Sequence, residues 1–193
     1  KQIHTMIWRL LIPGLWLAWI AYWLVSATGN KTIVRRESPG SQLSYKLPLL
    51  IGGLLLTIYH WPGHWLSRPF LFPPHILFPL GAILVVLGLG FSVWARVHIG
   101  GNWSGIVTLK KDHQLIRTGP YRWVRHPIYT GILLALLGTV LAIGQWRGLI
   151  ALGFMTCGFI RKLRIEEQWL GEAFGPEYDA YKKEVSALIP GVY

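Results

Sequence analysis

Residues 128–160 read IYTGILLALLGTVLAIGQWRGLIALGFMTCGFI, which is two apolar runs separated by Gly144 and Gln145. Each run, 128–143 and 146–160, is slightly shorter than the roughly 20 residues with which a helix crosses a bilayer. A glycine between two apolar runs is typical of a tight turn. The sequence therefore predicts a helical hairpin, and this hairpin decides the fold class.

Three further apolar segments precede the hairpin, at about residues 7–25, 47–59 and 76–95. Five such segments in 193 residues leave too little polar sequence to cover them in water. We therefore expect an all-α polytopic membrane protein with about five transmembrane helices and a cytoplasmic C-terminal helical segment. No internal repeat divides the chain, so we expect a single integral membrane domain over residues 1–193.

The composition agrees with this class of protein. Hydrophobic residues make up 52% of the chain and charged residues 14%, whereas an ordinary soluble domain has about 25% charged residues. The formal charge of +11 is, in so apolar a chain, more typical of cations at lipid headgroups than of nucleic-acid binding. Cys157 is the single cysteine, which excludes an intrachain disulfide and a cysteine-based zinc site. We expect no nucleic-acid partner and no metal.

Lysine and arginine residues gather in alternate connections. They are frequent in residues 26–46, 96–127 and 161–193, whereas the other two connections contain only Arg68 and Arg147. Cations favour the cytoplasmic side of a membrane protein. The pattern therefore predicts an N-terminus outside and a C-terminus in the cytoplasm. It also places the two large polar regions in the cytoplasm, where we expect any chemistry.

The first polar region contains HQLIRTGPYRWVRHPIYTG at residues 113–131. Pro127 keeps His126 out of helical geometry and suits the first turn of the following helix. His126 is thus predicted at a helix N-terminus, a place that favours anionic groups. His98, Asn102 and Trp103, which follow the third apolar segment, are candidates for lining the same cavity. The same residues also fit a basic and aromatic collar at the membrane surface, which composition alone favours slightly.

The second polar region begins with RKLRIEE at residues 161–167. If the preceding helix continues, Arg161 and Arg164 share one face, and Lys162 and Glu166 share another. A carboxylate beside guanidinium groups can bind a zwitterion or orient an acidic substrate. A solvated helix end with surface ion pairs is the plainer interpretation of this segment taken alone.

The later elements are FG at residues 174–175, followed by Tyr178 and Tyr181. Together with GPYRWVRHPIYTG at 119–131, the hairpin and RIEE at 164–167, they resemble the isoprenylcysteine carboxyl methyltransferase family, which is related to phospholipid N-methyltransferases. The resemblance is strong over residues 96–193, which we expect to be the catalytic half. The RHPxY element alone is less specific, because integral-membrane sterol reductases have a similar one.

The resemblance implies S-adenosylmethionine as methyl donor, bound on the cytoplasmic side. By motif position, the donor-binding residues are His113, Gln114, Leu115, Ile116, Tyr121, His126, Pro127, Tyr129 and Glu166. The family has an acceptor-orienting arginine where this chain has Lys162, and lysine does not replace arginine at a bidentate site. Either the acceptor is not a prenylcysteine here, or a neighbouring arginine, Arg164 or Arg161, orients it.

The kind of acceptor decides whether a base is needed. A carboxylate is already deprotonated at pH 7, whereas an amine needs a general base, for which Glu167 or Glu166 is the candidate. We expect methyl transfer to a lipophilic or prenylated acceptor in the bilayer, with a carboxylate favoured as in prenylcysteine methylation. The alternatives are an amine N-methyltransferase, an NADPH-dependent sterol-type reductase and a non-enzymatic membrane scaffold or transporter subunit. We expect the membrane to be a prokaryotic cytoplasmic membrane.

Overall fold

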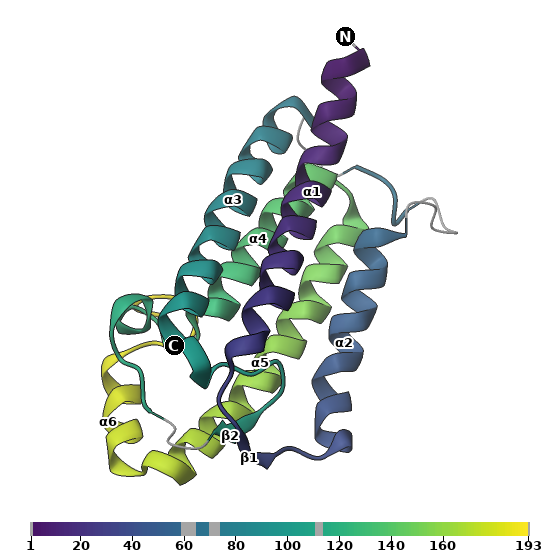
Figure 1. Ribbon diagram of the computed structural model, residues 1–193. Helices are drawn as coiled ribbons and strands as arrows, with labels where there is room; N and C mark the ends of the chain where they lie inside the picture. The colour runs from purple at the N-terminus through teal and green to yellow at the C-terminus, as the bar shows by residue number, and fades with distance from the viewer. Residues whose placement is uncertain (1, 59–64, 70–73, 111–113, 193) are drawn as a thin grey trace.

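Five long helices lie side by side in the computed structural model, which describes residues 2–58, 65–69, 74–110 and 114–192 (Figure 1). They are α1 (Gln2–Ser26), α2 (Pro39–Thr57), α3 (Pro74–Ile99), α4 (Pro127–Ile143) and α5 (Trp146–Phe174). A short helix, α6 (Pro176–Glu184), follows α5. Three single 3-10 turns complete the helical elements: η1 (Ala27–Gly29), η2 (Gly100–Asn102) and η3 (Gly119–Arg122). The prediction of a mostly helical fold is confirmed.

A small antiparallel sheet departs from the all-helical prediction. Strand β1 (Ile33–Arg36) pairs with β2 (Thr108–Lys110), and Arg36 lies opposite Thr108. This pairing joins the connection after α1 to the connection after α3. It therefore fixes residues 103–110 below the helix ends, where Figure 1 shows β2 beside α5.

The predicted hairpin is confirmed. Helix α4 ends at Gly144, whose φ of 63° is left-handed and whose backbone N–H donates to the Val140 carbonyl at 2.9 Å. Glycine takes this conformation without a Cβ clash. Helix α5 then begins at Trp146 and runs for 29 residues, well past the apolar segment that ends near residue 160. Glu166 and Glu167 therefore lie on the same continuous helix as the hairpin tip.

Helix α2 starts earlier than the apolar pattern indicates. The side chain of Ser38 accepts a hydrogen bond from the Ser41 backbone N–H at 3.2 Å, and Pro39 occupies the first helical position. Both features are preferred at a helix N-terminus. At its other end, the buried side chain of Arg147 donates to the Leu55 carbonyl at 3.1 Å and thereby binds the last turn of α2 to the hairpin tip.

Glycines bring α3 and α4 into close contact. A Cβ atom on Gly81 would lie 2.4 Å from the Gly138 carbonyl oxygen, and one on Gly88 would lie 2.5 Å from that of Gly131. Small residues at such positions let two helix backbones approach, as is common in membrane helix pairs. Helix α1 packs on this pair through its tryptophans, where Trp19 Nε1 donates to Ser92 Oγ at 2.8 Å. The α3–α4 pair is thus the centre of the bundle.

One helix of the described residues, Ile76–Asn102, is long and apolar enough by itself to cross a membrane. Leu10–Ser26 and Pro127–Ile143 are apolar helices of less than that length. The outward faces of the bundle also carry many exposed large apolar side chains, such as Leu17, Leu24 and Val86. The number of spans and the orientation remain predictions.

Candidate active site

His126 directly precedes α4, and backbone hydrogen bonds to the segment after α6 hold it in place. Its φ of −121° and ψ of 60° are non-helical, and Pro127 is buried directly after it, as the sequence predicts. The backbone N–H groups of Arg125 and His126 donate to the Ser186 and Ala187 carbonyls at 2.9 and 3.0 Å. The segment after α6 therefore runs alongside the RHP element and determines where the imidazole lies.

The imidazole of His126 lies between two carboxylates of α5. Its Nδ1 is 3.5 Å from Oε2 of Glu166, and its Nε2 is 3.2 Å from Oε1 of Glu167. The side chain is 7% exposed, so these contacts are largely shielded from water. Contacts on both nitrogens favour the imidazolium form, in which each nitrogen donates.

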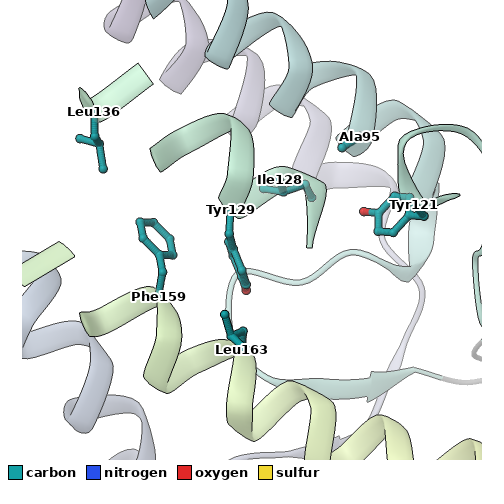
Figure 2. Close-up of a cluster of buried hydrophobic side chains, with 7 residues drawn as sticks. All are labelled: Ala95, Tyr121, Ile128, Tyr129, Leu136, Phe159 and Leu163. Carbon is teal, nitrogen blue, oxygen red and sulfur yellow. The ribbon is translucent and has the colours of Figure 1, made fainter. Parts of the chain in front are cut away.

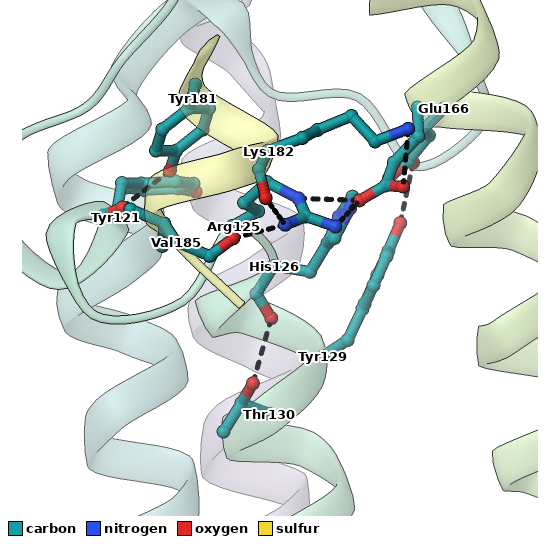
Figure 3. Close-up of polar contacts among 10 residues, drawn as sticks. Tyr121, Arg125, His126, Tyr129, Thr130, Glu166, Tyr181, Lys182 and Val185 are labelled. Carbon is teal, nitrogen blue, oxygen red and sulfur yellow. Dashed lines mark hydrogen bonds and ion pairs between the residues drawn. The ribbon is translucent and has the colours of Figure 1, made fainter. Parts of the chain in front are cut away.

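Glu166 has two further partners. The hydroxyl of Tyr129 donates to its Oε1 at 2.6 Å (Figure 3), and Nζ of Lys162 lies 4.0 Å from the same oxygen. The Tyr129 ring stacks on the His126 ring, with centroids 5.6 Å apart and an interplanar angle of 7°. On its other side Tyr129 packs against Phe159 in the buried apolar cluster (Figure 2). The bundle core thus sets the position of the hydroxyl that binds Glu166.

Arg125 connects Glu167 to the C-terminal segment. Its Nε lies 2.8 Å from Oε1 of Glu167, while Nη1 donates to the carbonyls of Lys182 and Val185 (Figure 3). Nζ of Lys182 lies 3.8 Å from the other oxygen of Glu167. The sequence analysis noted Arg125 only as a cation near His126. Its structural role depends on partners about 40 and 60 residues away, which local sequence does not reveal.

The charges of this cluster reinforce one another. Burial by itself would raise the pKa of Glu167, but hydrogen bonds with His126 and Arg125 outweigh it and hold the pKa at about 2. Burial likewise disfavours the charged forms of His126 and Glu166, yet their mutual contact raises the pKa of His126 and lowers that of Glu166. The contacts within the cluster therefore favour an imidazolium between two carboxylates.

A pocket opens beside this cluster. Its volume, counted out to its open mouth, is about 900 Å³. The walls come from the end of α3, the segment after it, η3, the start of α4, α5 and α6. Seven of the residues predicted to bind the donor line it: Gln114, Leu115, Ile116, Tyr121, His126, Tyr129 and Glu166. Asn102 and Trp103 line it as well, whereas His98 does not and instead lies 2.8 Å, Nε2 to Oγ1, from Thr118.

The other predicted site residues lie elsewhere. Pro127 is buried beneath His126, and Glu167 lies behind His126 against Arg125 and faces a second, more polar hollow. Arg161 and Arg164 are exposed on α5 and do not line the first pocket, whereas the intervening Lys162 is buried and donates to the Gly105 carbonyl at 2.8 Å. His113 lies outside the residues that the structure describes.

Residues 76–177 match the phospholipid methyltransferase family. The chain is 39% identical over 114 residues to the protein-S-isoprenylcysteine O-methyltransferase of Saccharomyces cerevisiae, an alignment that covers 58% of this chain and 48% of the relative. It is 28% identical over 178 residues to the protein of that name from Dictyostelium discoideum, covering 91% and 71%. The chain spans about half the length of the first of these relatives.

A solved structure has a similar fold. The structure of the eukaryotic intramembrane Ras methyltransferase, isoprenylcysteine carboxyl methyltransferase, matches with a TM-score of 0.51 and 26% sequence identity. The match covers 82% of this chain and 55% of that chain. The pocket and its charged cluster therefore lie within a fold that this chain shares with an intramembrane protein.

Proposed function

Because the chain belongs to the phospholipid methyltransferase family, we propose that it is an integral membrane enzyme that methylates a carboxylate on a prenylated, membrane-partitioned acceptor. The proposed methyl donor is S-adenosylmethionine, bound in the pocket beside His126. Similarity to the isoprenylcysteine O-methyltransferases supports both the reaction class and the acceptor. The catalytic half proposed from the sequence, residues 96–193, contains the whole charged cluster.

The state of the two carboxylates is the observation that carries the choice of acceptor. Glu167 accepts from Arg125 and His126, and its pKa of about 2 makes it a weak base. Glu166 is bound by Tyr129 and His126, and its pKa is also lowered, by the contact with His126 despite its burial. An acceptor that must lose a proton finds no ready base among these groups. A carboxylate acceptor, which is already ionised, needs none.

The chemistry of the pocket fits the proposed donor. Glu166 supplies a carboxylate for a cationic group, and His126 and Arg125 supply positive charge for an anionic one, as a zwitterionic amino acid requires. The rings of Trp103, Tyr121 and Trp169 offer flat surfaces for a base. When bound, S-adenosylmethionine supplies an already activated methyl group, so the residues mainly have to align the reactants. Because both nitrogens of His126 contact carboxylates, its positive charge stays in one place while the reactants bind.

We propose five membrane spans, formed by α1 to α4 and by residues 146–160 of α5, with the N-terminus outside and the pocket at the cytoplasmic surface. Half-exposed tryptophans support this placement. Trp94 and Trp123 lie at the pocket end of the bundle, whereas Trp65 and Trp146 lie at the hairpin tip. The 17 residues of α4 between these ends span about 25 Å, close to the roughly 30 Å of a hydrocarbon core. Tryptophans gather at both membrane interfaces.

The decisive experiment uses the detergent-purified full chain with S-adenosylmethionine labelled in its methyl group. The acceptors are a farnesylated N-acetylcysteine, its carboxamide and phosphatidylethanolamine. We expect label on the farnesylcysteine alone, and mild base should release this label as volatile methanol. Base-stable label on phosphatidylethanolamine would instead establish amine methylation. Binding of NADPH without binding of S-adenosylhomocysteine would refute the methyltransferase assignment.

A further inference from the structure

Three of the residues that line the pocket each have a buried polar atom without a hydrogen-bond partner. These atoms are Oδ1 of Asn102, Oγ1 of Thr108 and the hydroxyl of Tyr178. Among the residues that the structure describes, Nε of Arg96 is the one other buried side-chain atom in this condition. Buried polar atoms are nearly always paired, because an unpaired one costs the full free energy of its desolvation. Their concentration at one pocket indicates a ligand that pairs with them.

Packing does not account for Tyr178. Its side chain is 1% exposed and belongs to the same short helix as Tyr181. The hydroxyl of Tyr181 donates to the Tyr121 carbonyl, which gives that residue a structural partner. The hydroxyl of Tyr178 has none, although phenylalanine would fill the same space without an unpaired group.

The kind of ligand follows from the atoms. Oδ1 of Asn102 only accepts, so it needs an N–H or O–H group from the ligand. Asn102 is 8% exposed, and apart from Ser104 the pocket wall near it in sequence is apolar, with Ile99, Trp103 and Ile106. A prenyl chain would cover this wall but would leave Oδ1 of Asn102 and Oγ1 of Thr108 unpaired. A nucleoside offers a flat base for the wall together with an exocyclic amine and hydroxyls for the two polar atoms.

Tyr178 has a different environment. It lines the pocket together with Arg125 and Glu166, and it lies one helical turn before Lys182, whose carbonyl accepts from Arg125, so it belongs to the charged side of the pocket. Burial raises its pKa, so the phenol keeps its proton and can donate. A protonated phenol among these charges matches the carboxylate of a zwitterionic amino acid.

We propose that Asn102 and Thr108 hydrogen-bond the nucleoside portion of the methyl donor, and that Tyr178 hydrogen-bonds its amino-acid portion. This inference rests on the proposed function, because it assumes that the pocket holds S-adenosylmethionine. It assigns recognition of the donor to three residues outside the RHPxY and RIEE elements. It also gives the segment after α3 a binding role in addition to its place in the sheet.

Calorimetric titration of the purified full chain tests the proposal with two probes. One is S-adenosylhomocysteine, and the other is 5′-methylthioadenosine, which has the nucleoside but no amino acid. The variants Thr108→Val and Tyr178→Phe remove only a hydroxyl, and Asn102→Leu removes the amide at similar size. We expect Asn102→Leu and Thr108→Val to weaken both probes by about 3- to 10-fold each, as for the loss of one hydrogen bond. Tyr178→Phe should weaken S-adenosylhomocysteine to the same extent and leave methylthioadenosine unchanged.

Thermal unfolding of the unliganded protein separates binding from structure. Removing an unpaired hydroxyl should leave the unfolding temperature unchanged or raise it for Thr108→Val and Tyr178→Phe. The matched control Tyr181→Phe should lower it, because that hydroxyl has a partner. If the wild type binds S-adenosylhomocysteine and the variants bind it equally well, the proposal is wrong and the proposed function stands. If the wild type does not bind it, both fail. Weaker methylthioadenosine binding by Tyr178→Phe would overturn the assignment of Tyr178.

Discussion

Nε and Nη2 of Arg125 lie 2.8 and 2.7 Å from the same carboxylate oxygen of Glu167, and both side chains are at most 10% exposed. The remaining terminal nitrogen of the guanidinium donates to two carbonyls of the C-terminal segment, those of Lys182 and Val185. Arg125 therefore joins three parts of the chain: the start of α4, helix α5 and the end of α6.

Removal of this guanidinium should destabilise the protein. We expect Arg125→Ala to lower the free energy of unfolding by roughly 3–5 kcal/mol, because it removes the guanidinium that pairs with the buried Glu167. Arg125→Lys should recover only part of this loss, since an ammonium lacks the planar fork. Thermal unfolding in detergent measures both. Equal stability of wild type and Arg125→Ala would show that the ion pair does not hold the tail.

The acid limit of stability should depend on Glu167. Its pKa falls from about 4.5 in the unfolded chain to about 2 in the folded protein, so its contribution is full above the unfolded value. That contribution is lost as the pH falls from about 4.5 towards 2, and it amounts to roughly 3 kcal/mol. Glu167→Gln should therefore unfold more readily at neutral pH and show a flatter stability profile between these pH values. Parallel profiles for the two proteins would contradict this prediction.

The glycine contact between α3 and α4 should not tolerate a methyl group. Gly88→Ala places a Cβ 2.5 Å from the Gly131 carbonyl oxygen, which should cost about 1–3 kcal/mol of stability through overpacking. The control is Gly90→Ala on the same helix, where a Cβ meets nothing within 4 Å. This control should be neutral, or more stable by up to about 1 kcal/mol. Equal unfolding temperatures for the two variants would exclude a tight helix pair.

The proposed orienting role of Arg161 and Arg164 can be separated from donor binding. We expect Arg164→Ala or Arg161→Ala to raise KM for the acceptor by about tenfold, the size expected for one charge-assisted hydrogen bond, with the affinity for S-adenosylhomocysteine unchanged. Lys162→Met should instead weaken S-adenosylhomocysteine, since Lys162 lies 4.0 Å from Glu166. If only Lys162→Met raises the acceptor KM, the orienting cation is Lys162.

Patterns with a short period in the sequence predicted most of the fold. The apolar runs indicated the helices, and Gly144 indicated the turn of the hairpin. Motif positions predicted that His126 and Glu166 bind the same ligand, and both residues line one pocket in the structure. The sheet was not predicted, because β1 and β2 are four- and three-residue segments without an alternating pattern that pair across more than 70 residues. The contacts of Arg125 with Lys182 and Val185 also join residues that are far apart in the sequence. Whether Oδ1 of Asn102 has a partner likewise depends on which residues the fold places around it.

Helix α5 runs unbroken from the hairpin tip to a point beyond Glu166 and Glu167, 29 residues or about 43 Å. Because α5 is one continuous helix, a change in its tilt within the membrane displaces its proposed cytoplasmic end, where Glu166 and Glu167 lie. Hydrophobic helices tilt when lipid thickness differs from their own length. Because His126 directly precedes the separate helix α4, such a tilt changes the distances between His126 and the two glutamates of α5. The acyl-chain length of the surrounding lipid should thus change the distances from His126 to Glu166 and Glu167.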